Sequence, residues 1–173
     1  MKTQTRQQRE NRRGHSRSTV TVVKEYFQRE RIGSRARIHD DHVHLTVGSG
    51  PDEFIVYIDG LDDGPYHRIH VASIWDIDLP VESSQRILEA IQIINDFSII
   101  STVSAFEFDQ KLSISTSLEL DCPVQDDHVQ YALEAHLDLA GKCVEPLFAI
   151  AFHAISVGEI AKLFKRPGAK DIH

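Results

Sequence analysis

The fold is decided by residues 80–120, which read PVESSQRILEAIQIINDFSIISTVSAFEFDQKLSISTSLEL. The first half has helical spacing, in which every third or fourth residue is apolar. This apolar stripe consists of Ile87, Ala90, Ile91, Ile94 and Phe97. Ser83 or Ser84 precedes the stripe, and a serine hydroxyl at that point accepts a hydrogen bond from a free N–H group of the first turn. The first half therefore predicts an amphipathic helix that covers one face of a sheet.

The second half of the same stretch alternates apolar and polar residues in two runs, 99–108 and 111–120. Alternation with a period of two is typical of a strand with one buried face. The two runs meet at Asp109 and Gln110, where we expect a tight turn. The inward-facing set is predicted to be Val103, Ala105, Leu112 and Ile114. The stretch is thus a helix followed by a hairpin, and it contains no recognisable catalytic signature.

A helix and three strands are predicted upstream of this stretch. The helix begins near Ser16 or Ser18, either of which suits the N-cap, and Gly33 is placed to end it. Its apolar face is formed by Val20, Val23 and Phe27. The strands are predicted at 42–47, 54–58 and 66–77.

The predicted strands form an antiparallel meander with two turns. In the first strand Val43, Leu45 and Val47 alternate with His42, His44 and Thr46. Residues 48–52, GSGPD, form the first turn. The acidic segment 59–65 is interpreted as the second turn, since it lacks the 12-residue ligand spacing and the final glutamate of a calcium loop.

A long apolar helix is predicted after Asp126, whose carboxylate suits a helix N-terminus. Gly141 and Pro146 interrupt the helical spacing. Proline inside a helix removes a hydrogen bond and clashes with the carbonyl four residues earlier. We therefore predict a kink or break near Lys142, with helix resuming over residues 145–164.

Composition and charge predict one domain with a basic tail. A chain of 173 residues is a comfortable size for one hydrophobic core. Residues 1–17 hold six basic residues against one acidic residue, a net charge of plus five, which leaves minus twelve elsewhere in a chain of net charge -7. With Met1 as its only large apolar residue, this tail is predicted to be disordered. The domain is predicted over 18–165, followed by a C-terminal tail at 166–173.

The cysteines and the hydropathy indicate a soluble protein of a reducing compartment. Cys122 and Cys143 form neither a CxxC pair nor a disulfide framework, so we expect a cytoplasmic location. The longest mainly apolar run, residues 144–157, is shorter than the roughly 20 residues needed to span a membrane. An acidic body is also a poor platform for nucleic acid, so contact through the basic tail is not favoured.

The predicted element order resembles the YbjN family, also labelled bacterial sensory transduction regulators. Four pieces of sequence carry the resemblance. They are the opening VTVVKEYF at 20–27 that leads through Ile32-Gly33 to the Asp40-Asp41 turn, the third strand with Ala72 and Trp75 before Pro80, the helix end IQIIN at 91–95 followed by a hairpin, and the long helix after Asp126. The resemblance implies a fold like that of type III secretion chaperones, no known enzymatic activity, no cofactor, and a role in binding or regulation. The basic tail, the many histidines and the interruption at Gly141 and Pro146 depart from the family pattern.

Ten histidines in this chain raise the question of a metal site. One cluster is His39-x-x-His42-x-His44, and the other contains His67 and His70. His42 and His44 share one face of a predicted strand, and a neighbouring strand could bring His67 or His70 across from them. Three imidazoles suit zinc or nickel. We favour a solvated polar face, because these histidines lie opposite the apolar side of their strand.

Taken together, the patterns predict an α+β domain in which helices cover one face of a mostly antiparallel, five-stranded sheet. The other face or a sheet edge would remain free for a partner. The leading function hypothesis is a homodimeric, chaperone-like or regulatory module that binds protein and has no catalytic residues. Its candidate partner-binding residues are Trp75, Ile87, Ile91, Phe148 and Phe152, although Trp75 is more typical of a core residue. The alternative is a metal-dependent hydrolase that uses His42, His44, His67 and His70.

Overall fold

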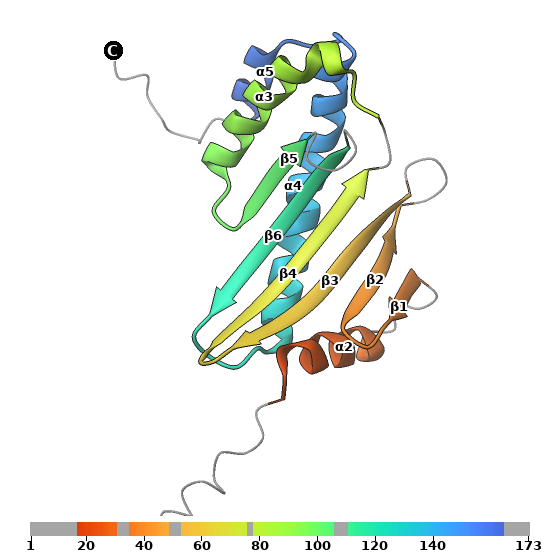
Figure 1. Cartoon of the computed structure of the whole chain (residues 1–173), viewed down its shortest axis with the longest axis vertical. Helices are drawn as coiled ribbons and strands as arrows, with labels where there is room; N and C mark the ends of the chain where they lie inside the picture. Colours follow the sequence, from red (N-terminus) through yellow and green to blue (C-terminus); the bar gives the residue numbers. More distant parts are fainter. Residues whose placement is uncertain (1–16, 31–34, 49–52, 76–77, 106–110, 165–173) are drawn as a thin grey trace, which may run out of the picture.

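The chain folds around one antiparallel sheet, as seen in the computed structural model (Figure 1). The structure describes residues 17–30, 35–48, 53–75, 78–105 and 111–164. In this part of the chain the sheet has six strands in the order β1-β2-β3-β4-β6-β5. The strands are β1 (Ala36–Ile38), β2 (His42–Val47), β3 (Phe54–Asp63), β4 (Tyr66–Trp75), β5 (Ser101–Ala105) and β6 (Leu112–Leu120).

The helices cover a single face of this sheet. They are α2 (Thr19–Arg29), the 3-10 turn η3 (Val81–Ser83), α3 (Ser84–Phe97), α4 (Asp126–Ala151) and α5 (Val157–Leu163). Helix α4 runs behind β4 and β6, α2 lies at the lower ends of β2 and β3, and α3 and α5 gather at the β5 end (Figure 1). The predicted α+β class and the predicted element order are confirmed, with one strand added.

The added strand is β1, which pairs with β2 through the register Ile38↔Val43 and Arg37↔His44. It has only three residues, too few to show an alternating pattern in the sequence. It is held by the backbone of β2, because the backbone N–H of His39 donates to the carbonyl oxygen of His42 at 2.9 Å. The five-stranded sheet predicted from the sequence is therefore one strand short.

The acidic segment after Ile58 is strand rather than loop. Strand β3 continues to Asp63, and its last residues pair with the start of β4, as in Asp63↔Tyr66. The turn is confined to Gly64, whose φ of 60° suits glycine, and Pro65. Ladder hydrogen bonds outweigh the low strand propensity of aspartate here.

Helix α2 begins as predicted, with Ser18 as its N-cap. It packs its first turn tightly onto β3, where the backbone of Thr19 approaches Gly60 so closely that a Cβ at residue 60 would lie 2.6 Å from it. The carboxylate of Asp62 accepts a hydrogen bond of 3.0 Å from the backbone N–H of Thr19. The helix ends at Arg29 and is capped by Glu30, whereas Gly33 lies outside the described residues.

The predicted break near Lys142 is absent, because α4 runs continuously from Asp126 to Ala151 with Pro146 inside it. The carbonyl of exposed Lys142, four residues before the proline, faces a solvated surface and can be hydrated. The other side of the helix buries an apolar stripe, so tertiary packing offsets the local cost. The stripe near the proline comprises Leu139, Ala140, Cys143, Leu147, Ile150 and Ala151.

The helix ends instead at Ala151. The backbone N–H of Ala154 donates to the carbonyl of Ala149 at 2.7 Å, and that of His153 donates to Ile150 at 3.1 Å. This pair of bonds is a Schellman motif, with His153 in the left-handed position at φ 61°. Helix α5 then starts with a capping box between Ser156 and Glu159.

The core consists of two hydrophobic clusters joined by α4. One lies under α2, β2 and β3 and takes in the first half of α4, and the other lies among α3, α5, β5, β6 and the second half of α4. His136 lies on α4 between them and is completely buried. Its ring nitrogens bond the hydroxyls of Ser73, at 2.8 Å, and Thr116, at 3.1 Å.

Several sequence predictions concern residues outside the described ranges. These are the tails at 1–16 and 166–173, the turn residues 49–52, the hairpin turn at Asp109 and Gln110, and the strand end at Ile77. Among the helices that the structure describes, none is both long and apolar enough to cross a membrane.

Candidate functional site

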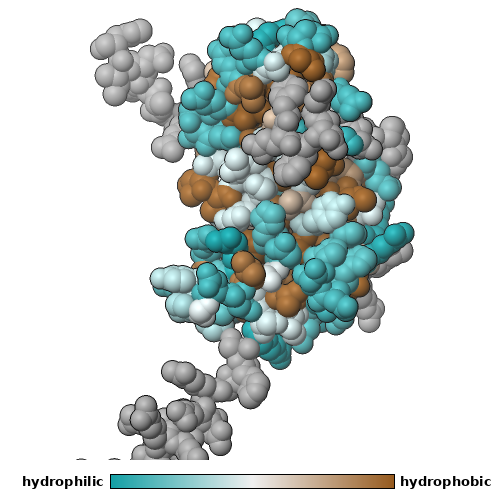
Figure 2. All heavy atoms as spheres, viewed as in Figure 1, coloured by the Kyte–Doolittle hydropathy of each residue, from teal (hydrophilic) through white to brown (hydrophobic). Residues whose placement is uncertain are grey.

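Within the described ranges, no helix or strand packs on the face of the sheet opposite the helices (Figure 1). Its side chains are mostly polar, and three partly exposed apolar residues lie on the two central strands near one end of the β3–β4 ladder: Ile55, Tyr57 and Ile74, at 42%, 39% and 41% exposure. Ile55 pairs directly with Ile74 across β3 and β4. Figure 2 views this face and shows apolar patches separated by hydrophilic atoms. We call Ile55, Tyr57 and Ile74 the outer-face patch.

The edge of the sheet at β5 is already occupied. The side-chain amide of Asn95, at the end of α3, donates to the carbonyl of Val103 at 2.9 Å and accepts from its N–H at 2.8 Å. The N–H of Ser101 donates to the hydroxyl of Ser98 at 3.1 Å. Edge strands with free backbone groups are templates for pairing with another chain. Because the side chains of Asn95 and Ser98 hydrogen-bond to backbone groups of β5, the surface open to a partner is a face or groove rather than this edge.

An apolar groove lies between the end of α3, the start of β5, α4 and α5. It has a volume of about 430 Å³. Three of its apolar residues stand out into solvent: Ile99 is 94% exposed, Leu163 is 63% exposed and Tyr131 is 54% exposed. Phe97 extends the same surface at 38% exposure. The ion pair of Asp138 and Lys142, 2.6 Å long, supplies a charged rim. We call this surface the α3–α4 groove.

The residues proposed for partner binding from the sequence lie mostly elsewhere. Trp75, Ile87 and Ile91 are at most 9% exposed and belong to the hydrophobic core. Phe148 is partly buried and packs against the same cluster. Phe152 alone is open to solvent, at 61% exposure. The apolar stripe of α3 packs against the sheet and α4. The exposed apolar surface therefore begins where the helix ends.

Ile99, the most exposed apolar residue of the groove, is not among the residues predicted to bind a partner. The sequence pattern placed it in the predicted strand at 99–108. In the structure β5 starts only at Ser101, and Ile99 lies in the connection before it. An isoleucine beside Ser98, just after a helix end, is the one local hint of a loop.

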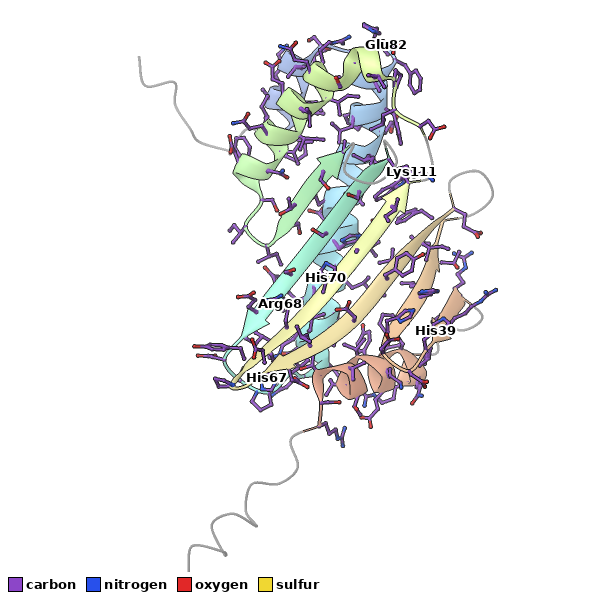
Figure 3. All side chains as sticks on the ribbon, in the orientation of Figure 1. His39, His67, Arg68, His70, Glu82 and Lys111 are labelled. Carbon is purple, nitrogen blue, oxygen red and sulfur yellow. The ribbon has the colours of Figure 1, made fainter. Side chains whose placement is uncertain are left out.

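The structure brings His42 and His44 together, but with His39 rather than with His67 or His70. The ring centroids of these three residues lie 4.5–4.6 Å apart. His67 lies at the far end of β4, where it contacts Asp62 at 2.7 Å, and His70 lies 3.6 Å from Asp59. Figure 3 shows His39 beside β1 and β2, well apart from His67. The convergence of the two histidine clusters, which the hydrolase alternative requires, is therefore not formed.

Burial and hydrogen bonds shift the pKa values of His44, Asp41 and Asp62. Partial burial lowers the pKa of His44, and the charges of His42, His39 and Arg37 add to this effect. The hydrogen bond from His42 lowers the pKa of Asp41. Burial works to raise the pKa of Asp62, but hydrogen bonds from Thr19 and His67 outweigh it and lower that pKa.

Cys143 is a poor nucleophile within the described fold. Burial raises the pKa of the Cys143 thiol to about 12, so the thiolate required for reaction is scarce at neutral pH. Cys122 is exposed and unpaired by any disulfide. The sequence favours both cysteines as small hydrophobic residues; Cys143 is packed in the core in this way, whereas Cys122 is exposed.

Comparison with known proteins supports a relation at the level of the fold. No protein-family model matches the chain, and no curated protein matches it significantly. Among solved structures, it is similar to the crystal structure of YbjN from E. coli, a proposed transcription regulator. The TM-score is 0.54 at 13% sequence identity, covering 77% of this chain and 92% of YbjN. The fold is thus YbjN-like.

Proposed function

We propose that this domain is a regulatory module that binds an apolar segment of a partner protein in the α3–α4 groove. The observation that carries the proposal is the exposure of Ile99, Tyr131 and Leu163 around one groove. The likeness to a proposed transcription regulator supports a regulatory role, and it names no enzyme.

The exposed side chains make binding at this groove favourable. Covering a fully exposed isoleucine contributes on the order of 2 kcal/mol, and Ile99 is 94% exposed. Aromatic residues such as Tyr131 and Phe97 are enriched in the central part of protein interfaces, whereas charges are found at the rim. The Asp138–Lys142 pair lies at such a rim. The groove therefore has the composition of a protein-binding site.

The occupant that fits best is an apolar peptide segment rather than a small molecule. The apolar residues spread over three helices and a loop, so a compact ligand would leave part of them exposed. A helix or extended segment with two or three apolar anchors covers them together. Shielding such a segment from solvent is a chaperone-like activity.

A photo-crosslinking experiment tests the groove. A photoreactive phenylalanine analogue replaces Ile99 in the full-length protein, and the same analogue replaces Leu88 as a matched control. Leu88 lies on α3 and is 49% exposed, but it does not line the groove. After irradiation in the native cells, we expect one dominant adduct from position 99 that is absent from position 88. The variant Ile99→Asp should lower capture of that partner at least tenfold.

Each outcome of this experiment bears on the proposal. A specific adduct with another protein supports it and identifies the partner. An adduct only with a second copy of the chain would show that the groove is a self-association surface and would refute partner binding there. Equal labelling from both positions would also contradict the proposal.

The metal-dependent hydrolase has no specific observation in its favour. It requires His44 to approach His67 or His70 within ligand distance, and the described residues do not form that group.

A further inference from the structure

Three histidines converge at the hairpin between β1 and β2. His39 and His42 flank the two-residue loop Asp40-Asp41, and the bond from the N–H of His39 to the carbonyl of His42 closes the hairpin. His44 follows two residues later in β2, so it shares a face with His42. The backbone of the hairpin thus places all three side chains on the outer face of the sheet.

The ligand atoms of these side chains already lie close to one another. One ring nitrogen from each of His39, His42 and His44 lies within 4.8 Å of the others. The Nε2 atoms of His42 and His44 are 2.8 Å apart. The rings of His39 and His42 are stacked, with an angle of 12° between their planes. Three nitrogen donors therefore surround one small volume.

A carboxylate orients the central imidazole. Oδ1 of Asp41 lies 2.5 Å from Nδ1 of His42, so Nδ1 carries the proton and Nε2 keeps its lone pair for a ligand. Metal-binding histidines usually hold this arrangement, in which the second nitrogen donates to a carboxylate or carbonyl. The ring of Tyr57 packs edge-on against His44, with centroids 4.5 Å apart, and fixes that side of the cluster.

We propose that His39, His42 and His44 form a binding site for a divalent transition metal, with zinc as the preferred ion. Zinc binds imidazole nitrogen at about 2.0–2.1 Å, which places ligands of a tetrahedral site about 3.3 Å apart. The nitrogens of the cluster bracket that separation, so small side-chain rotations suffice. His39 is exposed, which leaves the fourth position open to water or to a group from a partner.

The donor set selects the class of metal. Imidazole suits zinc, copper and nickel, whereas magnesium and calcium prefer oxygen ligands. Asp40 and Asp41 supply negative charge beside the cluster. Arg37 opposes it, because it lies across from His44 in the β1–β2 register. The affinity for zinc depends on the balance between the negative charge of the two aspartates and the positive charge of Arg37.

The site lies at the opposite edge of the sheet from the α3–α4 groove. Strand β1 forms one edge and β5 the other. A bound metal would tie β1 to β2 and stabilise this short edge strand. Zinc binding is therefore independent of the proposed partner groove and is tested separately.

Zinc titration of the full-length protein tests the proposal. The protein is first freed of metal with a chelator, and zinc is then titrated against a chromophoric competitor. We expect one zinc ion per chain. The variant His44→Ala should weaken binding about 100-fold and His39→Gln at least tenfold. Because His39 is exposed, His39→Gln keeps the fold and remains informative if His44→Ala does not fold.

Matched variants separate the site from adventitious binding by other histidines. Asp41→Asn should weaken zinc binding about tenfold, as expected for loss of an orienting carboxylate. Asp40→Asn removes the same charge from the same loop but no contact to His42, and it should change the affinity less than threefold. His70→Ala should leave the affinity unchanged.

A spectroscopic readout completes the test. Cobalt in place of zinc should give the intense visible absorption of a four- or five-coordinate site, and His39→Gln should abolish it. Wild-type affinity in both His44→Ala and His39→Gln would overturn the proposal, as would the lack of a one-to-one complex. Equal effects of Asp40→Asn and Asp41→Asn would overturn the assigned role of Asp41.

Discussion

The imidazole of His136 lies at the point where the two hydrophobic clusters meet, and it is the largest polar side chain in the described interior. Its neutral ring exchanges hydrogen bonds with Ser73 and Thr116, which are themselves fully buried. Burial, together with the charge of His70, lowers the pKa of His136 from 6.5 to about 4. The free energy of unfolding depends on pH because the pKa of this histidine is lower in the folded state than in the unfolded state.

This coupling predicts a loss of stability in acid. Below pH 6.5 the unfolded chain protonates this residue while the folded chain keeps it neutral until about pH 4. The unfolded state then binds more protons, so the free energy of unfolding falls as the pH falls. The contribution of His136 between pH 7 and pH 4 is about 3 kcal/mol. Urea unfolding of the wild type and of His136→Gln over this range should show a pH dependence that is weaker in the variant by about this amount.

The control for this measurement is Leu133→Ala, one turn away on α4. It removes apolar contacts but no titratable group, and it should cost about 2–5 kcal/mol at every pH. The wild-type pH dependence should persist in this variant. If His136→Gln also kept the full wild-type dependence, the assignment to His136 would be wrong.

At the scale of elements, the two glycines at 60 and 141 have opposite roles. Gly60 allows the first turn of α2 to lie against β3, where a Cβ would be 2.6 Å from backbone atoms of Thr19 and Val20. Gly141 lies in the middle of α4, on its exposed side, and a Cβ there would have no neighbour within 4 Å. Replacing each glycine with alanine therefore tests two different effects: the close packing at residue 60 and the low helix propensity of glycine at residue 141.

We predict that Gly141→Ala stabilises the protein and Gly60→Ala destabilises it. Alanine in a helix interior is favoured over glycine by about 1 kcal/mol, and nothing near residue 141 opposes it. At residue 60 the clash is with backbone, so we expect a loss of about 1–3 kcal/mol. Thermal or urea unfolding of the two variants measures both. A neutral or destabilising Gly141→Ala would argue against a continuous α4.

At the scale of the whole molecule, the outer face of the sheet is the surface left for a second copy of the chain. The β5 edge is occupied by Asn95, so edge-to-edge pairing there is blocked. The outer-face patch places Ile55, Tyr57 and Ile74 together on strands β3 and β4. We propose that the homodimer expected from the sequence forms through this patch.

Sedimentation velocity tests the dimer. We expect the wild-type protein, freed of metal, to sediment as a dimer at micromolar concentration. Tyr57→Asp should shift it to a monomer, because a carboxylate at the centre of the patch would be buried without a partner. Leu88→Asp, which changes an exposed residue of α3 outside the patch, should remain dimeric. A wild-type protein that is monomeric at all concentrations would exclude this part of the proposal.

Local periodicity accounts for what could be predicted of the fold. Val43 and Leu45 alternate with His42 and His44, and the structure buries the first pair and turns the second outward. Ser18 caps α2 as expected. These features depend on residues that are close in the chain, and their patterns repeat over one or two turns or along one strand.

Features that depend on distant partners were not predictable in this way. The continuity of α4 through Pro146 depends on burial against the sheet and α3, and the strand character of Asp59–Asp63 depends on pairing with β4. The meeting of His39 with His42 and His44 depends on β1, which has too few residues to show a pattern. The groove at Ile99 depends on where α3, α4 and α5 end relative to one another.

The sequence by itself determined the class of fold, the order of the elements and the inward face of most of them. It could do so because apolar spacing directly reflects which side of a helix or strand is removed from water. Only the tertiary structure decided which apolar residues remain exposed and which histidines converge. The exposed apolar residues are set by helix packing between segments far apart in the chain. The histidines converge because the three-residue strand β1 pairs with β2, and β1 is too short to show in the sequence pattern.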